Sequence, residues 1–316
     1  MTKKLFMLIV AFVCAATMAA QNIAVVSPSG VTTLYNTFPE AVEGAEDGSV
    51  VYLPGGRFVL SNALHITKKL TIVGIGHKSE SPDGITYIDG FIYFEGGSSG
   101  SALMGCYLDD AITIYSEVND ITIRHNRIYS VSTGGKRTFI NQNYISYVYG
   151  NLGSTSTNAS DISITHNVVY SVQHVYDGNI SNNILLGTGN NPFHHCQRST
   201  ITDNIITSSS PFWNCSDNYI SGNLMATDYE DNINIGSVNW SDVFVNYNTS
   251  DWVNSDYHLK GDFQQYEDQV GIYAGSGFDD KQLAPVPYIV AKKVDDQTDA
   301  QGKLNIKVRV KAGDAE

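Results

Sequence analysis

Residues 164–185 read ITHNVVYSVQHVYDGNISNNIL and contain one six-residue word twice. The word is aliphatic-x-x-Asn-x-aliphatic, and it occurs at 164–169 and again at 180–185. Four more copies flank this stretch, and a degraded copy at 103–108 has Cys106 in place of the asparagine. Self-similarity at a period near 20 residues is the signature of a repeat architecture. The asparagines of the six full copies are Asn126, Asn143, Asn167, Asn183, Asn204 and Asn223.

A repeat of this length holds only two or three short strands and cannot bury its apolar side alone, so its copies must stack. Stacking strands in parallel at ~4.8 Å predicts an all-β fold, a right-handed single-stranded parallel β-helix of about ten coils. We expect each asparagine to lie at a tight bend with a left-handed backbone. Its amide then bonds to the asparagine of the next coil and forms a ladder.

Aligning the copies on this word exposes two further columns. Five residues before each copy stand small or apolar residues, which we expect to face inward: Val118, Gly135, Ala159, Val175, Cys196 and Cys215. Three residues before each copy stand charged residues, which predict an exposed charge ladder: Asp120, Arg137, Asp161, Asp177, Arg198 and Asp217. Cys196 and Cys215 are stacked equivalents within the Cα range of a disulfide, but in-register side chains point alike, which favours free thiols. Their spacing fits no zinc site, and no metal is predicted.

The two ends of the stack need caps, because open ends expose strand edges. Residues 36–45 carry a helix-start signature and predict an N-terminal helical cap on a body that spans 21–280. Residues 243–246 and 257–259 are interpreted as the last rungs. Residues 281–316 predict a C-terminal hairpin that caps the far end.

The first 20 residues have the pattern of a secretory signal peptide. Lys3 and Lys4 precede an apolar run over 5–16, and small residues follow at Ala19 and Ala20. No later stretch has the ~18 consecutive apolar residues of a membrane span. We therefore expect a secreted protein, located in the periplasm, on the cell surface or outside the cell, with no membrane span.

Composition excludes several classes of protein. Only 16% of the residues are charged and 42% are hydrophobic, which argues against disorder, coiled coils and helical bundles. Without Lys3 and Lys4, 17 basic residues face 32 acidic ones, a net charge of −15. Nucleic acid is therefore excluded as an expected partner, because phosphate binding relies on Lys and Arg.

With the asparagine column and the opening DGSVVYLPGGRF (47–58) in view, the chain resembles the pectin-lyase-like right-handed β-helix superfamily over most of 36–260. Its opening and the segment DYHLKGDFQQYEDQVGIYAGSGFDD (256–280) look like those of secreted β-helix proteins of Bacteroidetes. The resemblance implies polysaccharides as ligands and lyase or hydrolase sites on the lateral face. Fold alone does not establish such an activity.

The catalytic motifs of those families are incomplete in this sequence. Asp109-Asp110 is present, but the G-H-G and R-I-K words of polygalacturonase-like members are absent, and an isolated acidic pair is commonly turn-forming. Calcium-dependent lyases need clustered acids beside an Arg or Lys base, and the acids here belong to the charge ladder. We therefore assign no catalytic residue and favour a non-enzymatic role. No cofactor is expected, and Ca²⁺ would be involved only if the protein were a lyase.

One paired word suggests a ligand-binding patch. PFHHC (192–196) and PFWNC (211–215) lie in register one coil apart, and the preceding coil has Gln173 and His174 at the equivalent places. If the two phenylalanines face inward, a neighbouring column of aromatic and polar residues faces solvent and suits sugar rings. The predicted site is Gln173, His174, His194, His195, Trp213 and Asn214.

We expect a polysaccharide or another glycan as partner. Residues 21–280 have 10 basic and 27 acidic residues, a net charge of −17 that favours neutral or amino sugars over uronates. A polysaccharide lyase or glycoside hydrolase, and a structural or adhesive surface module, remain the alternatives. The oligomeric state is left without a prediction.

Overall fold

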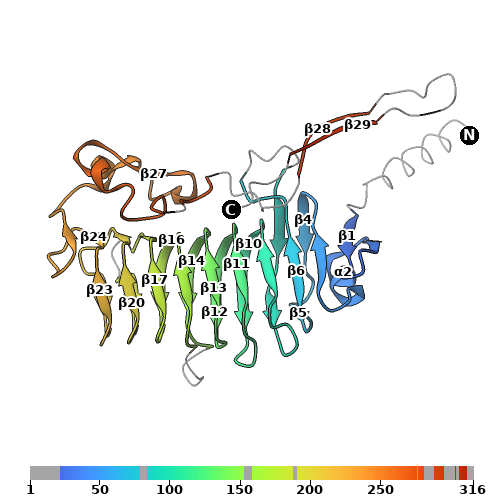
Figure 1. Cartoon of the computed structure of the whole chain (residues 1–316), viewed down its shortest axis with the longest axis horizontal. Coiled ribbons are helices and arrows are strands. Elements are labelled where there is room, and N and C mark those ends of the chain that lie inside the picture. Colours follow the sequence, from blue (N-terminus) through green and yellow to red (C-terminus); the bar gives the residue numbers. More distant parts are fainter. Residues whose placement is uncertain are drawn as a thin grey trace, which may run out of the picture.

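The computed structural model describes residues 22–78, 84–152, 159–187, 191–275, 277–280, 288–294, 303 and 306–311. They form a parallel β-solenoid of about eight turns (Figure 1), and the predicted β-helix fold is confirmed. The expected ten coils are too many, because the two segments interpreted as last rungs fold elsewhere. The predicted signal peptide lies outside the described residues. No helix formed by the described residues has the length and apolar character that crossing a membrane requires.

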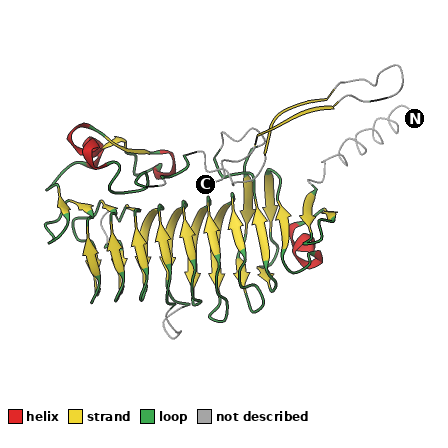
Figure 2. Ribbon diagram, in the orientation of Figure 1, coloured by secondary structure: helices red, strands yellow, loops and turns green. Residues whose placement is uncertain are grey.

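One lateral wall of the solenoid, here called sheet A, has 11 strands, of which the nine from β3 to β23 are parallel and in register (Figure 2). In spatial order they are β2 (Thr32–Tyr35), β1 (Ile23–Val26), β3 (Ser49–Tyr52), β6 (Leu70–Val73), β9 (Ala102–Met104), β11 (Thr122–Arg124), β13 (Phe139–Asn141), β15 (Ser163–Thr165), β17 (Asn179–Ser181), β20 (Thr200–Thr202) and β23 (Tyr219–Ser221).

The second wall, sheet B, has 14 strands that are parallel throughout. Its main path is β4 (Gly56–Val59), β7 (Thr86–Asp89), β10 (Tyr107–Ile114), β12 (Arg127–Thr133), β14 (Tyr144–Tyr149), β16 (Val168–Gln173), β18 (Ile184–Leu185), β21 (Ile205–Ile206), β24 (Leu224–Met225) and β25 (Ile233–Asn234). Four short strands continue it sideways: β5 (Leu64–Ile66), β8 (Ile92–Phe94), β19 (Phe193–His194) and β22 (Phe212–Trp213). Isolated bridges from Asn119 to Ser216 link successive coils on the third side.

The core lies between these walls and is built from columns of equivalent side chains. The aliphatic residues that begin the first five full copies of the word, such as Ile123 and Ile164, are fully buried, and Ile220 of the last copy is partly buried. Most members of the predicted inward column, such as Val118 and Cys196, are also fully buried. Alternation along each strand sends every second side chain inward, so one position of the repeat fills one column of the core.

The six asparagines form a single file, each donating from Nδ2 to the Oδ1 of the next at 2.9–3.1 Å. Asn232 extends the file beyond Asn223 at 2.8 Å. We predicted a left-handed backbone at the asparagines themselves. It falls instead on the residue before each asparagine, such as His125 and Gln142. The reason is a second bond: each asparagine amide also donates to the carbonyl two residues back, which bends the chain at the residue between.

The exposed charge column is present on the solenoid surface. Arg137 pairs with Asp120 of the preceding coil at 2.6 Å, and Arg198 pairs with Asp177 at 2.7 Å. All six members have φ between 50° and 61°. Aspartate tolerates this left-handed region better than most residues, which accounts for its frequency in the column.

The N-terminal cap is formed as predicted. Helix α2 (Phe38–Gly44) begins at Thr37, whose hydroxyl accepts a bond from the Glu40 backbone N–H. Phe38, Ala41 and Val42 are buried against the first coil. Strand β1 pairs antiparallel with β3, and β2 pairs antiparallel with β1, which completes this end.

The segments expected to be the last rungs instead form an arm that folds back along the outside of sheet B (Figure 1). This C-terminal arm, residues 240–280, holds α3 (Trp240–Val243), β26 (Phe244–Asn246), the 3₁₀ turns Trp252–Asn254 and Gly261–Tyr266, and β27 (Asp256–Leu259). Its β26 and β27 pair antiparallel with each other.

The arm covers one outward-facing column of sheet B, and the residues of that column are apolar in the coils that the arm covers. The residue after each asparagine of the word is Arg127 in one coil but Val168, Ile184, Ile205 and Leu224 in later ones, and these four are buried in a second core. Tyr144, Trp240, Val243 and Phe278 belong to the same cluster. An apolar outer column requires a cover, which the arm provides.

Strands β28 (Tyr288–Val294) and β29 (Ile306–Lys311) form the predicted antiparallel hairpin. In Figure 1 the hairpin projects near β4 and not over β23 and β24, where we had expected it to cap the stack.

Candidate functional site

A continuous outward column crosses sheet B on the side away from the arm. Strand pairing places its eight members in register: His65, Tyr93, Thr113, Ser132, Tyr149, Gln173, His194 and Trp213. Successive members lie one strand spacing apart, ~4.8 Å. We call this row the lateral column. It consists of regularly spaced aromatic and polar side chains that run along the solenoid.

A hollow of about 470 Å³ lies over the middle of the lateral column. Thr113, Ser132, Tyr149 and Gln173 line it along the column, and Asn151, Leu152 and His174 line it at the side. The Gln173 amide donates to the Ser171 hydroxyl at 3.2 Å, which orients its carbonyl. The hollow thus combines an aromatic ring with hydroxyl and amide groups, the mixture that carbohydrate sites use.

The predicted site residues adjoin this hollow. Phe193 is fully buried and stacks on Phe212 at 5.2 Å, so His194 and Trp213 face outward, as the alternation requires. Trp213 is 48% exposed, and its ring lies 5.3 Å from that of His194. Two strand pairs, β16 with β19 and β19 with β22, therefore bring Gln173, His194 and Trp213 side by side.

The chain bends between the phenylalanine and cysteine columns at His174, His195 and Asn214, which all have left-handed φ near 50°. The His174 and His195 rings stack at 4.8 Å, and the edge of Trp213 meets His195 at 4.9 Å. Both His194 and His195 are partly exposed. Burial, followed by the charges of His195 and His194, lowers the pKa of His174, so the His174 ring favours its neutral form, which can donate and accept hydrogen bonds.

A group of tyrosines beside the hollow was not predicted. Tyr147 stacks on Tyr149 at 6.0 Å, and Tyr129 meets Tyr147 edge-on at 5.6 Å. Tyr129 is 53% exposed. Burial, then the neighbouring tyrosines, raises the pKa of Tyr149. These rings lie outside the six-residue word, and the strand extension that carries them is visible only in the structure.

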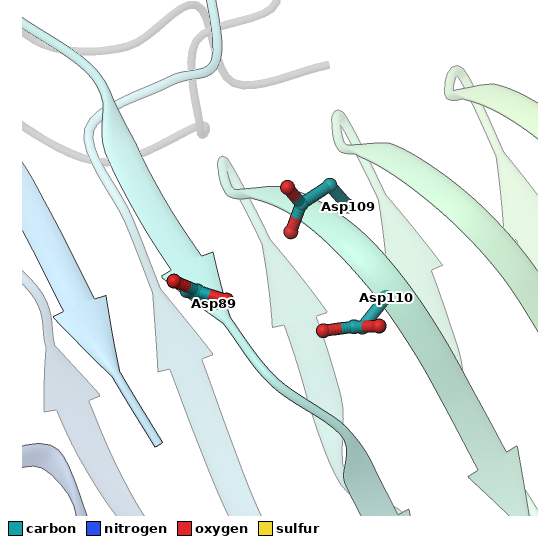
Figure 3. A group of neighbouring side chains, drawn as sticks. All are labelled: Asp89, Asp109 and Asp110. Carbon is teal, nitrogen blue, oxygen red and sulfur yellow. The ribbon is translucent and has the colours of Figure 1, made fainter. Parts of the chain in front are cut away.

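A second cluster joins Asp89 to the Asp109-Asp110 pair (Figure 3). A β-bulge in β10 places two residues opposite one of β12, and the pair lies in this bulge. One carboxylate oxygen from each aspartate lies within 4.8 Å of the others, an arrangement of hard oxygen ligands that Ca²⁺ or Mg²⁺ prefers. The expectation that Asp109-Asp110 is an isolated pair is therefore wrong.

Two of the three aspartates have side-chain partners, and Asp110 accepts a hydrogen bond from the Gly90 backbone. Arg57 forms an ion pair with Asp89 and stacks over Tyr87 at 5.2 Å, and the Tyr87 hydroxyl donates to Asp109. Burial raises the pKa of Asp110, and the charges of Asp109 and Asp89 add to the effect. Asp110 consequently holds a proton more readily than an ordinary aspartate does.

A third polar cluster lies on the C-terminal arm, where we predicted nothing. Glu267 accepts from His258 Nδ1 and from the Leu259 N–H, while Asp280 lies 3.9 Å from His258 Nε2 and accepts from the Tyr273 hydroxyl at 2.8 Å. The His258 and Tyr273 rings stack at 3.7 Å. These bonds lie within the arm and tie its end to β27.

The chain was compared with models of protein families, with curated proteins and with solved structures, and none of the three comparisons found a match. The structure supports membership of the parallel β-helix class, and the likeness to pectin-lyase-like proteins remains a resemblance carried by sequence words.

Proposed function

We propose that this protein is secreted and presents the lateral column as a rigid surface for binding a polysaccharide. The observation that carries the proposal is the in-register run Tyr149, Gln173, His194 and Trp213 beside a hollow of about 470 Å³. Sugar rings stack on aromatic faces and exchange hydrogen bonds with amides and imidazoles. A chain of linked sugars lying along the solenoid would meet one such residue per coil.

Charge narrows the class of sugar. The net charge of −17 over residues 21–280 opposes binding of polyuronates, and none of the described residues that line the hollow is a lysine or an arginine. Neutral or amino-sugar polymers are the expected ligands. Preorganisation supports binding, because the column belongs to paired strands and its side chains need little ordering.

The test is a panel of neutral, amino and acidic polysaccharides titrated while tryptophan fluorescence is followed. Trp213 is half exposed on the column, whereas Trp240 is nearly buried and Trp252 packs against Tyr144 and Tyr170 under the arm, so a ligand on the column changes mainly the Trp213 signal. Trp213→Ala is expected to weaken binding by about tenfold or more, as truncation of an aromatic hot spot does. Binding by Trp213→Ala is measured by calorimetry, since its signal is lost.

Tyr219→Ala is the matched control. Tyr219 belongs to the same coil and is 63% exposed, but it lies on sheet A. This variant should bind as the parent does. Equal loss in both variants, or no ligand in the whole panel, would contradict the proposal and would favour a structural or adhesive surface module.

A second candidate function, a polysaccharide lyase or glycoside hydrolase, is favoured by one observation, the carboxylates gathered at Asp89, Asp109 and Asp110. Paired carboxylates carry out glycoside hydrolysis, and a cation held by them would bridge an acidic substrate. Turnover is measured as new reducing ends and as absorbance of unsaturated uronates, with and without Ca²⁺. Activity lost in Asp109→Asn but kept in a His194→Ala, His195→Ala double variant would establish this function in place of the first.

A further inference from the structure

The last two coils of the solenoid carry a pair of stacked thiols. His194 pairs with Trp213 just before the two cysteines, and Gln197 pairs with Ser216 just after them. Cys196 and Cys215 therefore occupy the same position one strand spacing apart, ~4.8 Å, inside the Cα range of a disulfide. Both are free thiols, as side chains that point alike favour, and a hydrogen bond between the two thiols keeps their sulfurs within reach of each other. Each sulfur lies 3.5 Å from two equivalent carbonyl oxygens, those of Val172 and His194 for Cys196 and those of Phe193 and Trp213 for Cys215.

The two thiols differ in access to solvent. Cys196 is completely buried, whereas Cys215 is only partly buried. In the described part of the chain, no strand pairs with the outer edge of β22 or β23, so Cys215 ends its column without a coil above it. A small reagent can reach the sulfur of Cys215 and must pass it to reach Cys196.

The two thiols also differ in acidity. A hydrogen bond with the Cys196 thiol, partly offset by burial, lowers the pKa of Cys215 below its ordinary value. The same hydrogen bond, together with burial, raises the pKa of Cys196. The accessible Cys215 thus forms a thiolate more readily, whereas the buried Cys196 keeps its proton. Cys215 therefore has the properties of an attacking cysteine, and Cys196 those of a resolving cysteine.

We propose that Cys215 and Cys196 form a thiol–disulfide exchange site for small disulfides of the glutathione type. The Cys215 thiolate attacks one sulfur of the small disulfide, whose S–S bond breaks, and one small thiol leaves with a proton from water. Cys196 then loses its proton to solvent and attacks the Cys215 sulfur of the mixed disulfide. The second small thiol leaves, the small disulfide has been reduced to two thiols, and the two cysteines are oxidised to a disulfide that joins the last coils.

The joined coils carry the end of the lateral column, since Trp213 lies two residues before Cys215. The cross-link would hold this coil on its neighbour and shield an edge that the stack leaves open. The exchange chemistry itself does not depend on whether the column binds a glycan.

The test is incubation of the reduced full chain with oxidised glutathione at pH 7, followed by alkylation of remaining thiols and peptide mapping. Trypsin cleaves after Arg198, between the two cysteines, and not again before Lys260, so the disulfide is seen as peptides 138–198 and 199–260 joined together. The parent should give this product. Cys196→Ser should stop at a glutathione adduct on Cys215, and Cys215→Ser should leave Cys196 unmodified.

Cys106 is the internal control, because it is fully buried in an inner coil and burial raises its pKa to about 12. It should react with oxidised glutathione at least about tenfold more slowly than Cys215. Circular dichroism verifies that the variants fold, and Cys196→Ala replaces Cys196→Ser if the hydroxyl disturbs the core. A stable glutathione adduct on Cys215 in the parent, or equal reactivity of Cys106 and Cys215, would overturn the proposal.

Discussion

The imidazole rings of His174 and His195 lie parallel at 4.8 Å, at the same position of successive coils. Partial burial makes it costly to charge His174, and repulsion from a protonated ring at this separation adds to that cost. The stack is therefore a site where the charge state of histidine and the stability of the solenoid are linked.

We predict that stability falls as the pH drops below about 6.5. The pKa of His174 is lowered in the folded protein, so in the window below its ordinary value the unfolded chain binds more protons than the folded one. Thermal unfolding between pH 5 and pH 8 measures the effect. His174→Gln should have a flatter dependence, and parallel curves for parent and variant would contradict the assignment.

The middle of the asparagine ladder is expected to be far more sensitive than its end. Asn167→Ala removes the acceptor of the Asn143 N–H and the donor to the Ile140 carbonyl, both buried. Leaving these groups unpaired should lower the free energy of unfolding by about 3–5 kcal/mol.

Asn232→Ala is the matched comparison for the ladder, because Asn232 is its partly exposed last member and water can replace its bonds. It should cost roughly 1 kcal/mol. Urea unfolding of both variants gives the two values. Equal losses would mean that the ladder is not cooperative along the stack.

Removing Tyr144 should release the arm without unfolding the solenoid. Tyr144 is buried and meets Trp252 at 5.8 Å and Phe278 at 5.5 Å, so its ring is shared between sheet B and the arm. Tyr144→Ala should weaken this contact by about 3–5 kcal/mol. Hydrogen exchange in residues 240–280 should then speed up while sheet A keeps its protection.

The neighbouring residue supplies the control for the arm. Ile145 faces the inner core and does not belong to the cluster that the arm covers. Ile145→Ala should destabilise the coils and arm together. A Tyr144→Ala protein whose arm exchanges as slowly as the parent's would refute the role assigned to this ring.

Neutralising Asp110 should stabilise the protein at neutral pH. Burial and two neighbouring aspartates raise the pKa of Asp110, so the folded state binds more protons than the unfolded state above its ordinary value of 3.8, and stability falls as the pH rises through that window. Asp110→Asn removes this penalty. Its melting temperature should exceed the parent's at pH 7 and approach it near pH 3.

Asp228→Asn, in an exposed loop, controls for the general loss of one negative charge. A calcium series tests the cluster directly. A rise in melting temperature of the parent with Ca²⁺ that is absent in Asp110→Asn would assign a cation to the three aspartates and strengthen the enzymatic alternative. A lower melting temperature for Asp110→Asn at pH 7 would contradict the charge argument.

The repeat alone determined which residues become neighbours within the solenoid. In a parallel stack in register, residues at one position of the word lie one above another whatever the length of the loops between them. Asn143 and Asn167, 24 residues apart, are therefore as close as Asn167 and Asn183, 16 apart. Gln173, His194 and Trp213 came together for the same reason, and period-two alternation placed them outward.

Only the tertiary structure decided what lies on the outer face of this wall. A short apolar segment such as Phe244–Asn246 has the same local pattern whether it forms a rung or packs on the outside, so its sequence does not distinguish the two. The arm packs on the coils in which the residue after the asparagine is apolar, such as Val168 and Ile184, and not charged, as Arg127 is. This change in residue type predicts a covering segment only once the structure shows that the residues lie on the outer face of sheet B. Likewise, a one-residue bulge gathers Asp110 with Asp89, because it changes the register of β10 that the repeat would otherwise impose.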